Sequence, residues 1–186
     1  MLEKIPAVVG YALSGLKAGI EKTAFHADFA DAPATIALTS PAFADGASLP
    51  ARFTADGAGA SPPLAWSGLP AGTAAVAILA EDADSPTPQP LVHLIAWTAT
   101  PGAGDIAEGA LSVGAAMNLG KNSFLKYGWL PPDPPTGHGA HRYLFQIYAL
   151  GRSPDLSSSP GRGALVDAMR GHVLAKGSLT GTYERR

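Results

Sequence analysis

The sequence contains no cysteine among its 186 residues. This excludes disulfide bonds, thiolate nucleophiles and zinc–thiolate sites, and it is compatible with the reducing cytoplasm, where we expect the protein to be. Charged residues are scarce at 15%, with a formal net charge of −2, and no basic stripe of the kind that binds nucleic acid is present. We therefore expect no nucleic-acid partner.

Long apolar runs are missing as well. No stretch reaches the ~18 apolar residues that a transmembrane helix needs, so we expect no transmembrane segment. The first residues also lack a basic segment followed by an unbroken apolar stretch, which disfavours a secretory signal. Glycine and proline are abundant instead, with 22 and 17 residues, beside 46% hydrophobic residues. These numbers favour a folded, mainly β protein with many turns, such as a sandwich of short strands, over a helical bundle.

The N-terminal part has a pattern of its own. Apolar residues at spacings of three and four predict one helix over residues 6–22. We expect residues 1–34 to form a helical extension and linker, and residues 35–186 to form a single domain. The helix either packs on this domain or makes a homodimer contact; a membrane-surface role is disfavoured because its polar face carries few cations.

Alternating or continuous apolar runs predict the strands of the domain. We expect extended segments or strands at 35–40, 61–66, 75–80, 91–98, 144–150 and 179–184, a short edge strand at 51–54, and a second helix at 164–175. Because side chains alternate along a strand, His93 should share one face with Leu91, Ile95 and Trp97.

Polar residues gather where these strands meet loops. Asp82 and Asp84 follow the run 75–80, His93 interrupts the run 91–98, and residues 137–143 read Gly-His-Gly-Ala-His-Arg-Tyr. The two glycines of that loop leave backbone N–H groups open, and successive N–H groups suit an anion. Each polar residue also has a plain structural explanation, and we expect Arg142 to pair with a carboxylate.

Two other kinds of site use the same residue types. Two histidines and an aspartate could hold zinc, but no His-Glu-x-x-His or comparable spacing is present. Serine, histidine and aspartate could form a hydrolase triad, but the Gly-x-Ser-x-Gly elbow is missing. Taken together, the strand-end carboxylates, the histidine within a strand and the glycine-histidine loop favour a site, and the metal and triad patterns are only weakly supported.

The order of these motifs resembles the phosphatidylethanolamine-binding proteins, also called Raf kinase inhibitor-like proteins, and their bacterial branch in particular. Residues 61–66 read Ser-Pro-Pro-Leu-Ala-Trp, like the family's Ser-Pro-Pro-Leu-x-Trp segment. Residues 82–86 are similar to its Asp-Pro-Asp-Ala-Pro box, with Ala83 and Ser85 as departures. Residues 139–143 match its Gly-x-His-Arg-Tyr motif.

The resemblance implies a two-sheet antiparallel β-sandwich with a small pocket at one end. That pocket would bind a small anion such as phosphate, acetate or phosphoethanolamine, or a phospholipid headgroup, and a kinase or protease could be the protein partner. A binding protein rather than an enzyme is implied, and we expect no metal and no cofactor. The ligand-binding residues expected from the loop and the resemblance are Asp82, Asp84, Pro86, His93, Gly137, His138, Gly139, Ala140, His141 and Tyr143.

Protonated histidines would hold the anion in this interpretation, so binding should strengthen as the pH falls through the high sixes. The alternative function is a hydrolase of phosphate or carboxylate esters that uses a metal or a water held by histidine and aspartate.

Overall fold

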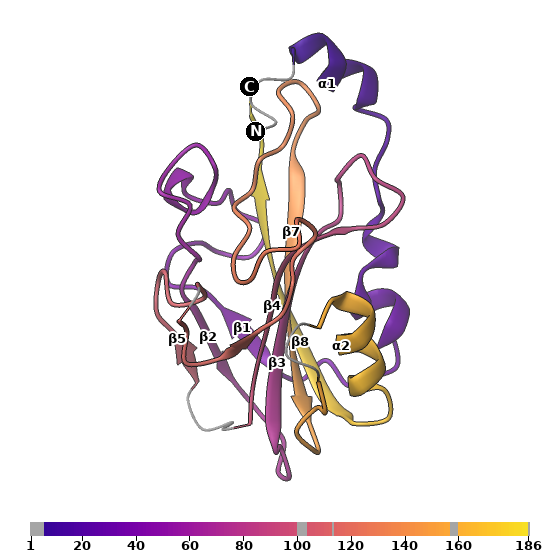
Figure 1. Ribbon diagram of the computed structural model, residues 1–186, viewed down its shortest axis with the longest axis vertical. Coiled ribbons are helices and arrows are strands. Elements are labelled where there is room, and N and C mark those ends of the chain that lie inside the picture. The colour runs from indigo at the N-terminus through magenta and orange to yellow at the C-terminus, as the bar shows by residue number, and fades with distance from the viewer. Residues whose placement is uncertain (1–5, 100–103, 113, 157–159, 186) are drawn as a thin grey trace.

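The computed structural model describes residues 6–99, 104–112, 114–156 and 160–185. Within these ranges the strands form two antiparallel sheets, a large one with the order β6-β4-β3-β7-β8 and a small one with the order β1-β2-β5 (Figure 1). The predicted two-sheet β-sandwich with two helices is therefore confirmed. The elements are α1 (Ala7–Leu13), β1 (Ala37–Thr39), β2 (Leu64–Ser67), β3 (Ala75–Asp82), β4 (Leu91–Thr98), β5 (Asp105–Ile106), β6 (Asn118–Leu119), β7 (His141–Leu150), α2 (Arg162–Met169) and β8 (Val173–Tyr183).

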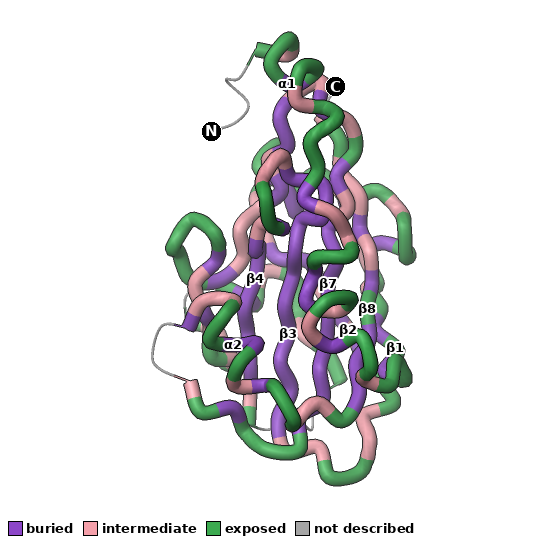
Figure 2. Tube along the Cα trace, turned by 90° about the vertical axis from the view of Figure 1, so that its right-hand side faces the viewer, coloured by how far each residue is buried: buried purple, intermediate pink, exposed green. Residues whose placement is uncertain are grey.

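The large sheet is buried on both faces. Val76 and Ile78 of β3 belong to the core between the two sheets, whereas Ala77 and Leu79 belong to a second core, under α2. This double burial explains why residues 75–80 form a continuous apolar run instead of an alternating one. Figure 2 shows the central strands as the most buried part of the chain.

The N-terminal segment lies along the same outer face as α2 (Figure 1). The predicted single helix over residues 6–22 is wrong in its second half, because α1 ends at Leu13. The N–H groups of Ala18 and Gly19 donate instead to the carbonyls of Ser85 and Ala83, at 2.9 and 2.8 Å. Contacts with the domain thus replace helical hydrogen bonds here, and we call residues 14–19 the strap.

Three local predictions also need correction. Residues 51–53 form a 3₁₀ turn after Pro50 rather than an edge strand, because the N–H of Phe53 bonds to the carbonyl of Pro50. The helix expected at 164–175 ends at Met169, since Val173 already pairs with Leu150 as the first residue of β8. The short strands β5 and β6 lie in segments where no strand was expected. In the described part of the chain, no helix is both long and apolar enough to cross a membrane.

A β-bulge in β4 changes the direction of His93. Leu94 pairs with Ala80 and Val92 pairs with Glu81, so His93 is the extra residue between them. A bulge reverses the alternation of side chains beyond it. Ile95 and Trp97 accordingly pack in the core under α2, whereas His93 and Leu91 line a pocket. The prediction that all four share one face is wrong for this reason.

Candidate functional site

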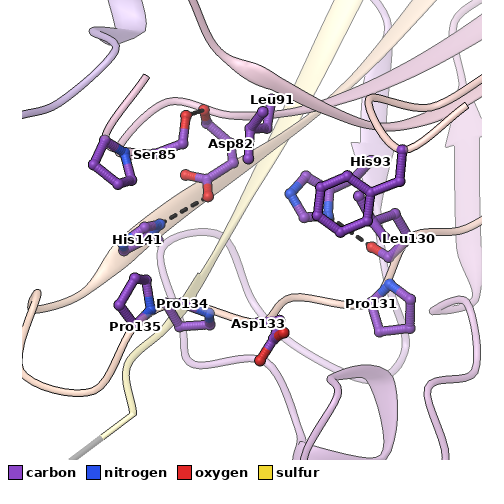
Figure 3. Close-up of a pocket in the computed structure, with 12 residues that line it drawn as sticks. Asp82, Ser85, Leu91, His93, Leu130, Pro131, Asp133, Pro134, Pro135 and His141 are labelled. Atoms are coloured by element: carbon purple, nitrogen blue, oxygen red, sulfur yellow. Dashed lines mark hydrogen bonds and ion pairs between the residues drawn. The ribbon is translucent and has the colours of Figure 1, made fainter. Parts of the chain in front are cut away.

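A small pocket lies at the end of the large sheet, where β3 ends and β4 and β7 begin (Figure 3). Its volume is about 30 Å³, which exceeds the ~10–15 Å³ that one water molecule requires. The pocket is lined by Asp82, Ser85, Pro86, Leu91, His93, Phe124, Leu130, Pro131, Asp133, Pro134, Pro135 and His141. Among the residues expected from sequence, Asp82, Pro86, His93 and His141 therefore meet here from distant parts of the chain.

His93 presents an unused ring nitrogen. Its Nδ1 lies 2.6 Å from the carbonyl oxygen of Leu130, and because a carbonyl only accepts, Nδ1 carries the proton. Its Nε2 is buried without a hydrogen-bond partner, and the ring faces Asp82 and His141 across the pocket (Figure 3). Burial lowers the pKa of His93 below its ordinary 6.5, although Asp82 partly opposes this. At neutral pH the free Nε2 is thus a hydrogen-bond acceptor.

His141, by contrast, has both ring nitrogens engaged. Nδ1 lies 2.7 Å from Oδ2 of Asp82, and Nε2 lies 2.8 Å from Nδ1 of His138. The Nε2–H of His138 donates in turn to the carbonyl of Leu16 in the strap, at 3.1 Å. A hydrogen-bond chain therefore runs from the pocket to the N-terminal segment. His138 is 2% exposed and does not line the pocket itself.

Asp84 is not among the residues that line the pocket, and it forms an ion pair instead. Its two carboxylate oxygens accept bonds from Nε and Nη2 of Arg142 at 2.7 and 2.8 Å, and Lys17 of the strap lies at 3.1 Å. Burial raises the pKa of Asp84, but the hydrogen bonds from Arg142 and Lys17 outweigh it and lower the value to about 2. The expected ion pair of Arg142 with a carboxylate is confirmed.

Tyr143 lies directly behind the pocket. It pairs with Asp82 across β3 and β7, and its ring meets that of His93 edge to face, at 5.0 Å between centroids. Its hydroxyl is buried and has no hydrogen-bond partner. Burial raises the pKa of Tyr143 well above 10, and the nearby carboxylates of Asp82 and Asp133 raise it further. The hydroxyl therefore stays protonated and can donate.

The glycine loop, residues 137–140, precedes His141 in the chain and is not part of the pocket wall. Gly137 and Gly139 have φ angles of 84° and 97°, which residues with a side chain rarely adopt. The N–H groups of Gly137 and His138 donate to the carbonyls of Arg185 and Pro135, so these two are used within the protein. None of the residues 137–140 contributes to the lining of the pocket.

Sequence reasoning missed a carboxylate and most of the apolar wall. Asp133 lines the pocket and lies 2.6 Å from Nη1 of Arg185 near the end of the chain. The stretch 131–135, Pro-Pro-Asp-Pro-Pro, is a visible signal because it is rigid and leads into the glycine loop. Phe124 gave no signal, since only the tertiary fold brings it to the pocket. Among the described residues, no group of three or more His, Asp or Glu side chains could hold a metal ion.

Comparisons with known proteins agree on one family. A family model described as phosphatidylethanolamine-binding protein matches residues 39–184. The UPF0098 protein PH1269 of Pyrococcus horikoshii is 36% identical over 152 residues, which cover 79% of this chain and 76% of the relative. The UPF0098 protein Rv1910c of Mycobacterium tuberculosis is 39% identical over 150 residues, or 80% of this chain and 70% of the relative. Similar proteins thus occur in both archaea and bacteria.

Solved structures support the same fold. The chain is similar to CT736 of Chlamydia trachomatis, a phosphatidylethanolamine-binding protein homologue, with a TM-score of 0.76 and 33% identity over 82% of this chain and 99% of that one. It is also similar in fold to YbcL of E. coli, with a TM-score of 0.77 and 24% identity over 82% of this chain and all of the other.

Proposed function

The chain belongs to the phosphatidylethanolamine-binding protein family, and on this premise we propose that it binds a small oxyanion in the pocket between His93 and His141. Proteins of this family are generally binding proteins without catalytic activity.

The unpartnered Nε2 of His93 is the observation that carries the proposal. A buried polar atom without a partner costs ~1–3 kcal/mol, so such atoms are rare in folded proteins. Here the atom belongs to the bulge residue of β4, and bulges often redirect a side chain at a functional site. The hydroxyl of Tyr143 is a second unsatisfied group next to it. A ligand with one protonated oxygen, for Nε2 of His93, and one acceptor oxygen, for the Tyr143 hydroxyl, would satisfy both groups at once.

The two carboxylates of the lining do not prevent anion binding, because each is paired. Asp82 accepts bonds from His141 and from the backbone N–H of Asp84, at 2.7 and 2.9 Å. Asp133 forms its ion pair with Arg185. The remaining contacts to a ligand would fall on His93 and Tyr143.

A proton must accompany the anion. Neutral His93 offers a lone pair at Nε2, which repels an oxyanion unless the ring or the ligand supplies a proton. Burial lowers the pKa of His93, so the ring alone would supply that proton only below pH 6.5. This moves the expected strengthening of binding from the high sixes to lower pH.

Phosphate, acetate and phosphoethanolamine, free or as a phospholipid headgroup, belong to the proposed ligand class. A partner protein, such as a kinase or a protease, could present the same chemistry. Hydrolysis of phosphate or carboxylate esters is the alternative function. Both ring nitrogens of His141 are bonded within the protein, so Nε2 of His93 would have to activate the water.

A crystal soaked in phosphate tests the proposal. We expect phosphate oxygens within hydrogen-bonding distance of Nε2 of His93 and of the Tyr143 hydroxyl. An unoccupied pocket at saturating phosphate would refute it. Turnover of a chromogenic phosphate or acetate ester that disappears in a His93→Phe variant would favour the hydrolase instead.

A homodimer through α1 is a separate proposal. Val8 and Tyr11 are 71% and 68% exposed, which leaves apolar surface on this helix. The mass in solution, measured for the full chain and for a Val8→Ser/Tyr11→Ser variant, tests it. A monomeric mass for the unmodified chain would remove the idea.

A further inference from the structure

Three hydrogen bonds join Asp82, His141, His138 and the carbonyl of Leu16 in one line, at 2.7, 2.8 and 3.1 Å. Both ends of the line, a carboxylate and a carbonyl, are acceptors. Each of the three contacts needs a proton, and the two rings must provide all three. Two neutral imidazoles carry only one proton each, so the intact line contains one imidazolium.

The extra proton belongs on His141. Its ring touches the carboxylate of Asp82, and a charge-assisted bond of 2.7 Å favours the cation. Among the described residues no carboxylate contacts His138, and both its burial and the neighbouring His141 lower the pKa of His138. His138 is therefore the neutral ring, with a proton on Nε2 for Leu16 and a lone pair on Nδ1 for His141.

The surroundings of the two rings agree with this distribution. The charged and titratable groups that face them are Asp82 from β3, His93 from β4, Tyr143 from β7 and Lys17 from the strap. Lys17 disfavours a second positive charge on His138. It is also paired with Asp84, beside Arg142, so it does not compete for Asp82.

The strap fixes the proton on His138. If Nε2 of His138 lost the Leu16 carbonyl, its proton could move to Nδ1, which would then donate to His141. His141 would no longer need its second proton. The strap is kept in place by backbone bonds of Ala18 and Gly19 to the turn after β3, and it lies outside residues 39–184 that the family model matches.

We infer that His138 and the Leu16 carbonyl hold His141 as an imidazolium, and that this charge balances Asp82 so that the pocket accepts an anion. The inference rests on the proposed anion-binding function for its consequence. His138 is then a positioning residue, because it acts on the ligand only through His141. The N-terminal strap thereby becomes part of the anion site.

Nuclear magnetic resonance of protein with ¹⁵N-labelled histidine rings tests the inference at pH 7. We expect His141 to carry two ring protons, His138 one on Nε2 and His93 one on Nδ1. In a His138→Phe variant, His141 should become neutral at this pH and the affinity for phosphate should fall about tenfold. His138→Asn keeps an acceptor for His141 and should restore both properties.

His172→Phe is the matched control, since His172 lies in the turn between α2 and β8, away from the pocket. A neutral His141 in the unmodified protein would overturn the inference. This measurement is made on the unmodified protein, so it does not depend on whether a variant folds. So would a His138→Phe protein with unchanged ring states and affinity. If the unmodified protein shows the expected ring protons but binds no phosphate at any pH, the proposed function fails while the proton assignment stands.

Discussion

Nε2 of His141 lies 2.8 Å from Nδ1 of His138, so the nitrogen that a ligand would otherwise meet is bonded within the protein. The other nitrogen of His141 is bonded to Asp82. Of the two histidines that line the pocket, only His93 therefore has a ring nitrogen available. In the proposed site, direct contact with the ligand would therefore fall to His93, and His141 would act through its charge.

Tyr143→Phe separates binding from stability. The hydroxyl is buried without a partner, so its removal should leave the free energy of unfolding unchanged or raise it by about 1 kcal/mol. Phosphate affinity should fall several-fold, because one donor to the anion is lost. Urea denaturation and calorimetric titration measure the two quantities. A destabilised variant with normal affinity would show that the hydroxyl serves the fold.

Arg142→Gln should destabilise the fold by about 2 kcal/mol, since it leaves the buried carboxylate of Asp84 with Lys17 as its remaining cation. Arg52→Gln is the matched control: its pair with Glu108 is exposed on both sides and should contribute less than about 0.5 kcal/mol. Urea denaturation at neutral pH compares them. Equal losses for the two variants would mean that burial of Asp84 does not matter.

Gly10→Ala should release α1 from the domain. A Cβ atom at position 10 would overlap the backbone carbonyl oxygen of Thr136, which no side-chain movement can relieve. Gly15→Ala meets no atom within 4 Å and is the control. Limited proteolysis should cut the N-terminal segment faster in the first variant only. Identical cleavage rates would contradict the packing of α1 on the glycine loop.

The stability of the ligand-free protein should fall as the pH falls below 6.5. The folded state holds the pKa of His93 below 6.5, so in this range the unfolded chain binds a proton that the folded chain resists. The stabilisation is complete above pH 6.5 and is lost below it, by at most about 1.4 kcal/mol per pH unit for one ring.

Urea denaturation between pH 8 and 5.5 checks this dependence. His93→Phe should give a shallower slope than the unmodified protein, while His172→Phe should keep the original slope. The slope will not vanish in His93→Phe, because burial also lowers the pKa of His138. If His93→Phe leaves the pH dependence of the unfolding free energy unchanged, a group other than His93 causes it.

Sequence was sufficient for the sandwich and for part of the pocket. Residues 75–80 and 91–98 are apolar runs of the kind found in strands that are buried on both faces. Asp82 and Asp84 follow the first run, near the point where its strand ends. The direction of His93 was not predictable from alternation, because a bulge has no period. The bond from His138 to Leu16 spans 122 positions and depends on tertiary packing, which local patterns do not encode.

Calorimetric titration of sulfate into the protein from pH 8 to 5.5 tests the central claim most directly, because sulfate brings no proton of its own in this range. We expect affinity to rise as the pH falls below 6.5, by up to about tenfold per pH unit, with one proton taken up for each sulfate bound. His93→Phe should abolish both effects. Sulfate binding of constant strength at every pH without proton uptake, or normal binding by His93→Phe, would contradict the account.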